Sequence, residues 1–429
     1  MNRTRTPPEA APPIRLGLRE NLAQFALLVG VNALVGGMIG QERTVLPLLA
    51  HDEFGLSKYT ATLTFIAAFG IVKAATNFFA GTLSDRYGRK PVLVAGWIVG
   101  IPVPLLLMWA PTWAWVVFAN MLLGVNQGLT WSTTIIMKID LVGPAKRGLA
   151  MGFNEAAGYV AVAATALATG WIASAHGLRP EPFFLGLAYA ALGLGLSTLA
   201  VRETHGHARH EATNHTPTAT GHHDGLTTGE IFRLTSFRDK ALSSCSQAGL
   251  VNNLNDGLAW GLFPIFFADA GLSVGRIGIL AALYPAAWGL GQLYTGGLSD
   301  RVGRKPVLVA GYALYACVYG AFAINTRADW CWLLFGIYGL FPALTEGVEK
   351  ALVSDLAPRN SRATILGLHG TLQAVGLFPA SVIGGILWDS ISPEATFWFA
   401  GTIGMAAAIG LAFLPATPLG PKTPQPEHG

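Results

Sequence analysis

Three charged side chains, Glu346, Glu349 and Lys350, lie close together in an otherwise mostly apolar stretch, FPALTEGVEKALVSDL. On a helix, spacings of three and four residues place them on one face, where Glu346 can pair with Lys350. One carboxylate is then left without an obvious counter-charge. In a low-dielectric site such a group favours its protonated form, so it is a candidate proton carrier or a ligand for a cationic substrate. The alternative is a structural ion pair, or a group near the end of the helix.

Other polar or ionisable residues also lie inside long apolar stretches, where burying a charge is costly and therefore indicates function. Glu42 and Arg43 are either a coupling acid with its counter-charge or residues near the outer end of their stretch. Lys73, Glu155 and Asp256 are favoured as cavity residues. His369 joins these candidates for substrate or proton coupling, although a hydrogen bond to a neighbouring helix also explains a buried histidine.

Histidines are concentrated between the two halves of the chain, where the polar segment 202–230 contains six of the ten. Neutral imidazoles close in sequence can bind nickel, zinc or copper, but no fixed spacing here defines a coordination geometry. The alternative is a solvated low-complexity segment. The candidate metal ligands are His205, His207, His210, His222 and His223.

The elements that position these residues are apolar helices. The chain is 52% hydrophobic and 12% charged, whereas soluble proteins carry roughly twice that charge. Stretches of about 20 apolar residues are long enough to cross a bilayer as helices. We predict twelve, near residues 21–50, 58–80, 91–110, 112–137, 148–173, 183–201, 241–268, 274–297, 306–325, 330–354, 363–388 and 394–415.

The placement of basic residues predicts the orientation of these spans. One set of loops contains only four basic residues, Lys58, Arg179, Arg276 and Arg327. The opposite loops contain Arg86, Arg89, Lys90, Lys138, Lys146, Arg147, Arg301, Arg304, Lys305, Arg359 and Arg362. Basic loops stay in the cytoplasm. We therefore expect a multi-pass protein of the plasma (inner) membrane with both termini in the cytoplasm.

The chain also contains an internal duplication. The sequence GTLSDRYGRKPVLVAG at 81–96 recurs as GGLSDRVGRKPVLVAG at 296–311, an offset of 215 residues. At the same offset Asp140 is matched by Asp355, and Arg147 by Arg362. Two parallel halves related by an axis along the membrane normal are a recurring transporter plan, with the substrate path between them.

This duplication predicts five regions. They are a cytoplasmic N-terminal segment (1–20), a six-helix bundle (21–201), a His-rich cytoplasmic linker that we expect to be flexible (202–236), a second six-helix bundle (237–416) and a cytoplasmic tail (417–429). The predicted fold class is thus an all-α membrane protein with about twelve transmembrane helices in two pseudo-symmetric bundles.

The repeated loop resembles the signature of the major facilitator superfamily, and the resemblance extends over nearly the whole chain. It implies a secondary transporter that alternates access by rocking one half against the other. An aspartate near the start of the next helix favours that helix's positive end, and the basic residues can bond groups across the interface. The alternative is that these basic residues only fix topology and meet anionic lipid. The implied gating residues are Asp85, Arg86, Arg89, Lys90, Asp300, Arg301, Arg304 and Lys305.

Within the superfamily the chain looks most like proton-coupled exporters of small molecules, although Gly124 stands where drug antiporters have an arginine. The leading hypothesis is proton-coupled export of an organic compound. The alternatives are an exporter of a divalent metal or its chelate, and a non-transporting receptor or scaffold. Catalysis is disfavoured, because no phosphate-binding loop or nucleophile with its base is recognisable. The expected partners are a small-molecule substrate, protons and lipid, without nucleic acid or cofactor, and a monomer is sufficient.

Overall fold

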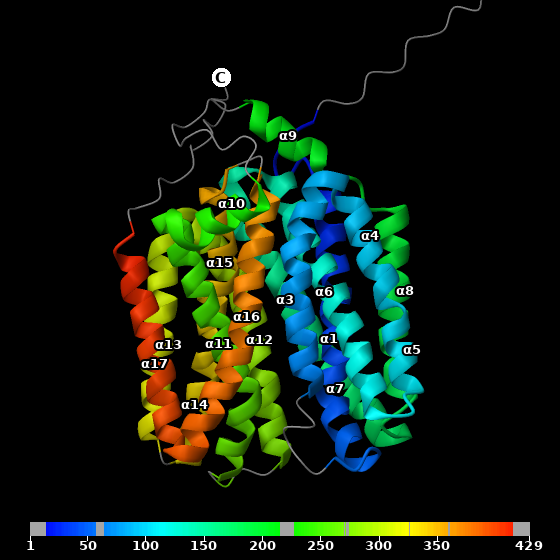
Figure 1. Ribbon diagram of the computed structural model, residues 1–429, viewed down its shortest axis with the longest axis vertical. Coiled ribbons are helices and arrows are strands. Elements are labelled where there is room, and N and C mark those ends of the chain that lie inside the picture. Colours follow the sequence, from blue (N-terminus) through cyan, green and yellow to red (C-terminus); the bar gives the residue numbers. More distant parts are fainter. Residues whose placement is uncertain are drawn as a thin grey trace, which may run out of the picture.

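The computed structural model describes residues 14–56, 64–214, 227–269, 271, 274–325, 327–358 and 361–414, and this part of the chain is a bundle of helices without strands (Figure 1). Eight of its helical segments are long and apolar enough to cross a membrane by themselves. The predicted all-α membrane fold is therefore confirmed. The described chain begins and ends at the same end of the bundle, which we call the linker end because the segment between the halves also lies there (Figure 1).

The first half contains six spans. They are α1 (Leu22–Asp52), α3 (Thr64–Tyr87), α4 (Arg89–Gly100) continued by α5 (Pro102–Met108), α6 (Trp113–Val142), α7 (Arg147–His176) and α8 (Phe184–Leu199). The helix α6 extends beyond the predicted span of 112–137, so Lys138 is part of a helix rather than of a loop. The expectation that Lys138 lies in a loop was therefore wrong.

The second half repeats this order. Its spans are α11 (Lys240–Asp269), α12 (Val274–Val302), α13 (Arg304–Ile324), α14 (Ala328–Tyr338) continued by α15 (Leu340–Leu356), α16 (Arg362–Ser390) and α17 (Pro393–Ala412). In each half the repeated loop joins the second span to the third. The internal duplication of the sequence is thus a duplication of the helical architecture.

The segment between the halves is more structured than its composition suggests. Residues His205–Asn214 form α9, which lies across the linker end (Figure 1). Residues Thr228–Arg233 form α10, which continues into the π-helical turn Leu234–Arg238. The prediction of a flexible linker is therefore wrong for these residues. The sequence pattern missed α9 because contacts with other helices, rather than apolar periodicity, hold it in place.

The halves meet along two pairs of helices, in which α3 packs against α16 and α7 against α12. Gly81 and Gly296, at the first position of each repeat copy, lie at these crossings. A Cβ atom on Gly81 would lie 2.2 Å from the Ala363 carbonyl oxygen, and one on Gly296 would lie 2.3 Å from that of Gly148. Glycine is needed here because the two backbones approach too closely for any side chain.

We expect Gly81→Ala to separate the halves at the linker end. The added methyl group must displace the backbone of α16, and overpacking of this kind costs about 1–3 kcal/mol. A matched control is Gly195→Ala in α8, because a Cβ atom there meets nothing within 4 Å.

The separation can be measured by electron paramagnetic resonance between spin labels at Tyr87→Cys and Val302→Cys. These side chains end the second span of each half and are 59% and 50% exposed. The labelled chain carries Cys317→Ala, since Cys317 is the exposed native thiol whereas Cys245 and Cys331 are buried. A distance distribution in Gly81→Ala that matches that of the control would contradict the prediction.

Candidate functional site

The aspartate of each repeat copy bonds the first turn of a helix in the other half. The Asp85 carboxylate accepts hydrogen bonds from the backbone N–H of Thr364 at 3.2 Å and from its hydroxyl at 2.9 Å, at the start of α16. Asp300 accepts hydrogen bonds from the backbone N–H groups of Gly148 at 3.0 Å and Leu149 at 2.8 Å, at the start of α7. A helix N-terminus carries partial positive charge, so both contacts are favourable.

This arrangement corrects one part of the sequence-based expectation. The aspartates were expected to interact with the helix that follows the loop in the chain. Instead, the crossing of α3 with α16 and of α7 with α12 brings a helix start from the opposite half closer. The two contacts therefore hold the halves together at the linker end.

The arginines at the fourth position after each aspartate connect the loop to its own half. The Arg89 guanidinium donates from Nε to Asp140 at 3.0 Å, and Arg304 donates from Nε to Asp355 at 3.1 Å. Asp355 also accepts a hydrogen bond from Arg147 of the first half at 2.9 Å. Asp140, Asp355 and Arg147, which the internal repeat singled out, thus belong to one layer of charged groups that crosses the interface.

The other four basic residues of the two loops do not join this cross-interface layer in the described structure. Arg86 and Arg301 are exposed. Lys90 donates to the Thr198 carbonyl oxygen at 2.8 Å, and Lys305 to the Leu414 carbonyl oxygen, so each bonds its own half. The gating role that the resemblance implied for them is not supported by their contacts, whereas topology explains their charge.

Glu203, just after α8, ties the first repeat loop to the beginning of the linker. Its carboxylate accepts backbone hydrogen bonds from Arg89 and Lys90, both at 3.0 Å, and from Thr204 and His205, both at 2.9 Å. Burial raises the pKa of this carboxyl group, but the four hydrogen bonds outweigh it and hold the pKa below its usual value of 4.5. The ionised form is therefore stabilised in the folded protein.

We expect Glu203→Gln to lower the melting temperature at pH 7 but to have less effect near pH 3. A carboxyl group with a depressed folded-state pKa stabilises the fold above its unfolded pKa and loses this contribution as the pH falls through the folded-state pKa. Thermal unfolding of both proteins in detergent, followed by tryptophan fluorescence, measures the difference. A difference that is equal at both pH values would contradict the prediction.

A second polar cluster lies deeper in the bundle. Lys350 is six residues before the end of α15, which corresponds to about 9 Å along the helix axis. Its ammonium group bonds Glu346 at 2.6 Å, as the sequence spacing predicted. It also bonds Glu155 of α7 at 3.0 Å. Glu155 is fully buried and belongs to the other half, so this ion pair joins the two halves.

Lys138 extends this cluster into the first half, and the sequence analysis missed it. The side chain is 0% exposed, and its ammonium group donates to Asn154 Oδ1 at 2.6 Å. The Asn154 amide in turn donates to Glu155 at 2.9 Å. A signal was present, because Lys138 directly follows the apolar residues Ile135, Ile136 and Met137. Ending the predicted span at residue 137 assigned it to a loop.

Glu349 is the third acid of this region. Glu155 and Glu346 each form an ion pair with Lys350, whereas Glu349 forms none with a described residue. It is 0% exposed, and neither carboxylate oxygen has a hydrogen bond of acceptable distance and angle with a described residue, although the Tyr312 hydroxyl lies close to it. The Tyr312 hydroxyl donates instead to the Ala248 carbonyl oxygen at 2.6 Å. Lys138 and Lys350 carry two positive charges, and the carboxylates of Glu155 and Glu346 already balance them. An ionised Glu349 would therefore be an excess buried charge, which is costly.

His369 of α16 borders the same space as Glu349. A Cβ atom on Gly249 of α11 would lie 2.8 Å from His369 Cε1 and 3.2 Å from Glu349 Oε1. The imidazole is 1% exposed, and neither ring nitrogen bonds a described residue. The hydrogen bond to a neighbouring helix that would explain this histidine structurally is thus not found in the described part of the chain. Glu349 and His369 are thus two buried ionisable side chains that border the same position on α11.

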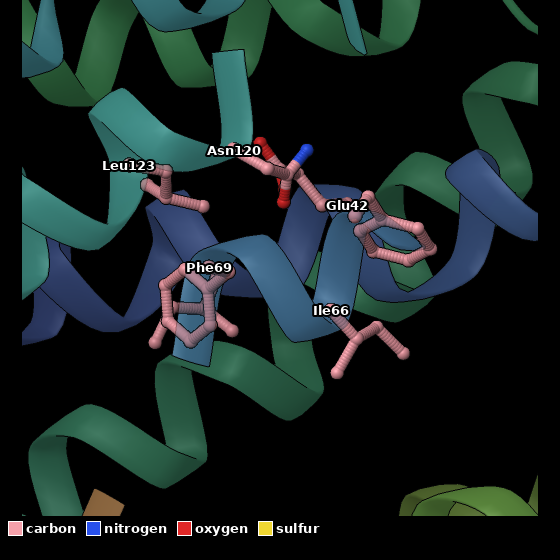
Figure 2. A pocket seen from close by; sticks show the side chains of 7 residues that line it. Glu42, Ile66, Phe69, Asn120 and Leu123 are labelled. Carbon is pink, nitrogen blue, oxygen red and sulfur yellow. The ribbon is translucent and has the colours of Figure 1, made fainter. Parts of the chain in front are cut away.

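Glu42 and Lys73 both lie in the first half, but Lys73 is close to the contacts between halves, because its ammonium group lies 5.7 Å from the centre of the Trp131 ring and the Trp131 indole donates to Glu155 at 3.5 Å. Glu42 is 2% exposed and lines a small pocket between α1, α3 and α6. Figure 2 shows its side chain beside Asn120, with Phe69 and Leu123 along the wall. The Lys73 ammonium group lies 5.5 Å from the centre of the Phe69 ring. Glu42 is thus buried, and its role as a coupling acid stays a prediction. The side chains of the candidates Arg43 and Asp256 lie outside the described residues.

Aromatic rings close the interface beyond the ion pair. Tyr159 of α7 stacks on Trp288 of α12 with ring centroids 3.4 Å apart, and it contacts Trp131 edge-on at 5.5 Å. Trp131 and Trp288 are 7% and 2% exposed. The halves are thus in contact from the linker end to this aromatic layer.

The histidine-rich segment provides less evidence for a metal site. His205, His207 and His210 lie on α9, whereas His222 and His223 fall outside the described residues. Within the residues that the structure describes, no group of three potential metal ligands occurs. Metal binding by the linker therefore stays a prediction from its sequence.

Comparison with known proteins places this architecture in a family. Residues 25–243 and 245–429 match the model of the Major Facilitator Superfamily. The tetracycline resistance protein, class G, of Vibrio anguillarum is 26% identical over 375 residues, which are 83% of this chain and 87% of that protein.

Other relatives match over shorter regions. An uncharacterised MFS-type transporter of Methanocaldococcus jannaschii is 40% identical over 135 residues, 32% of this chain and 34% of that protein. The quinolone resistance protein NorA of Staphylococcus aureus is 25% identical over 156 residues, 36% of this chain and 40% of that protein. Each of these two matches therefore spans less than half of the relative's length.

Two solved structures share the fold. The human organic anion transporter MFSD10 has a TM-score of 0.72 with 16% identity, covering 91% of this chain and 99% of that one. The proton:xylose symporter XylE also has a TM-score of 0.72, with 15% identity, covering 92% of this chain and 97% of that one. At these identities the likeness concerns the fold.

Proposed function

This chain belongs to the major facilitator superfamily, and from that premise we propose that it is a proton-coupled exporter of small organic molecules. As a member of this family it is a multi-pass membrane transporter and not an enzyme. The observation that carries the proposal is the buried carboxyl group of Glu349, which lies beside His369 and next to an ion pair that joins the halves.

The proposed coupling follows from the cost of burying an excess charge. While Glu349 is enclosed among helices of the second half, its carboxylate must be neutralised. A proton does this in one direction of the cycle, and a cationic or hydrogen-bond-donating group of the substrate does it in the other. Proton and substrate then exclude each other at one site, which is the requirement for exchange.

The cross-half contacts supply the conformational change. The structure is closed at the linker end, where Asp85 and Asp300 bond helix starts of the opposite half, and the Lys350–Glu155 pair joins the halves deeper in the bundle. Opening this end requires all three contacts to break. Binding or release of a proton or substrate at Glu349 changes the charge next to Lys350, the following residue in the chain. It therefore acts on the Lys350–Glu155 ion pair, which joins the halves.

The names of the relatives support an organic substrate and the export direction. Two of them are described as resistance proteins, for tetracycline and for quinolone, and a structural neighbour as an organic anion transporter. We further propose that the linker end faces the cytoplasm of the inner membrane, as the basic loops predict. Export then carries substrate from the linker end to the opposite side.

Gly124 explains why coupling must rest on these acids rather than on an arginine in α6. A Cβ atom at this position would lie 2.8 Å from the Phe69 carbonyl oxygen. A long side chain on α6 would therefore push α3 away. The arginine of the drug antiporters is thus sterically excluded here as long as α3 and α6 keep this spacing.

The proposal is tested by measuring proton movement in vesicles reconstituted with the full chain, on addition of organic cations, organic anions, divalent metals and metal chelates. A proton flux triggered by an organic compound, and abolished by a protonophore, is the expected result. A flux triggered only by a metal or its chelate would favour the linker histidines as the substrate-capturing element. Uptake without proton movement, or no transport of any compound, would contradict the proposal.

A further inference from the structure

Glu211, in the linker helix α9, is buried between two arginines from opposite halves. It is 1% exposed. One carboxylate oxygen, Oε1, accepts hydrogen bonds from Arg147 at 2.7 Å and from Arg362 at 3.0 Å, and Oε2 accepts one from Arg362 at 2.9 Å. Arg147 begins α7 in the first half and Arg362 begins α16 in the second half. A single linker carboxylate therefore binds both sides of the interface.

The internal duplication shows what Glu211 adds. Arg147 and Arg362 are counterparts in the repeat, but their surroundings differ. Arg147 reaches Asp355 in the opposite half at 2.9 Å. By symmetry Arg362 would pair with Asp140, yet the described contacts of Asp140 are with Arg89 and with the Thr204 hydroxyl, both at 3.0 Å. The acidic partner of Arg362 is Glu211, which comes from a segment that the chain contains only once.

The start of α9 is fixed to the first half. Glu203 bonds the backbone N–H groups of Arg89 and Lys90, and the Thr204 hydroxyl donates to Asp140. From this anchor α9 extends across the linker end to Arg362 of the second half (Figure 1). The helix therefore spans the interface and can hold it closed.

We propose that Glu211 is a gating residue of the transport cycle, which makes α9 a clamp that must release before the linker end opens. This inference rests on the alternating access of the proposed function, but not on its proton coupling or its substrate. Separating the halves pulls Arg147 and Arg362 apart, so one carboxylate cannot bind both. A buried carboxylate that loses one of its arginine partners is left with an uncompensated charge, which is costly. The closed state therefore depends on the contacts of α9.

The test is the distance between spin labels at Tyr87→Cys and Val302→Cys, in the Cys317→Ala background, measured for the full chain in lipid nanodiscs. We expect Glu211→Gln to raise the ratio of open to closed molecules roughly tenfold, because a buried charge pair is coupled strongly to its neighbours. Gln keeps the shape of the side chain but removes the charge that holds the two arginines. The open population should show as a longer distance.

A matched control is Glu230→Gln, which removes an equal charge from the same linker. Glu230 is exposed and closes the capping box with Thr227 at the start of α10, and none of its described hydrogen bonds is with Arg147 or Arg362. An unchanged distance distribution in Glu211→Gln, or an equal shift in both variants, would overturn the inference.

Rescue separates a gate from a general loss of folding. Glu211→Asp keeps the charge on a shorter side chain and should restore part of the closed population. A closed population in Glu211→Asp that is no larger than in Glu211→Gln would contradict a charge-dependent clamp. All these distances are measured without substrate and without a proton gradient. The outcome of this test is therefore independent of the flux measurements that test the proposed function.

Discussion

Glu349→Gln is expected to abolish substrate-driven proton movement while leaving the protein folded. Glutamine has nearly the same shape as the protonated acid, so the buried site tolerates it, but it cannot release a proton. The variant should thus remain locked in the form that resembles protonated Glu349. The measurement is the pH change inside reconstituted vesicles on addition of a transported compound, with melting temperature as the folding control.

The matched control is Glu394→Gln, because Glu394 is an exposed carboxyl group in the first turn of α17. It should transport like the unaltered protein. Proton movement in Glu349→Gln at the level of this control would remove Glu349 from the coupling mechanism. If Glu346→Gln alone lost proton movement, the carrier would be the acid that pairs with Lys350.

The second large effect is expected at the ion pair between the halves. Lys350→Met leaves Glu155 and Glu346 buried without their shared cation. Removing one partner of a buried ion pair costs about 3–5 kcal/mol. We therefore expect a clear fall in melting temperature and loss of transport in Lys350→Met.

A double-mutant cycle separates this pair from its surroundings. Glu155→Gln combined with Lys350→Met should be less damaging than the sum of the single changes, with a coupling energy of about 1–3 kcal/mol. Lys240→Met is the control, because Lys240 is exposed at the start of α11. Additive effects of the two changes would contradict a direct contact between Glu155 and Lys350.

These contacts show how the gate and the coupling site are connected. The charged layer at the linker end and the Lys350–Glu155 pair both cross the same interface, in which α7 takes part through Arg147 and Glu155. A change at the deeper pair therefore acts on a helix that the gate also uses. This connection requires no long-range network, since one rigid helix contains both groups.

Several features were predictable because they depend on residues close together in the sequence. Apolar stretches of sufficient length predict spans, and the repeat at 81–96 and 296–311 predicts two related halves. The pair between Glu346 and Lys350 follows from their spacing of four on one helix. The excess acid at Glu349 follows from the same local count of charges.

Only the tertiary structure decided which groups meet across the interface. Asp85 and Thr364 are 279 residues apart, and Glu155 and Lys350 are 195 residues apart. Such contacts depend on which helices cross and at what depth, and glycines such as Gly81 set that distance of approach. The linker helix shows the same limit, because Glu211 has its role only where two distant arginines converge. The periodicity of apolar residues in a segment predicts which of its faces is buried. The side chain that lies opposite that face is determined by the packing of the whole bundle.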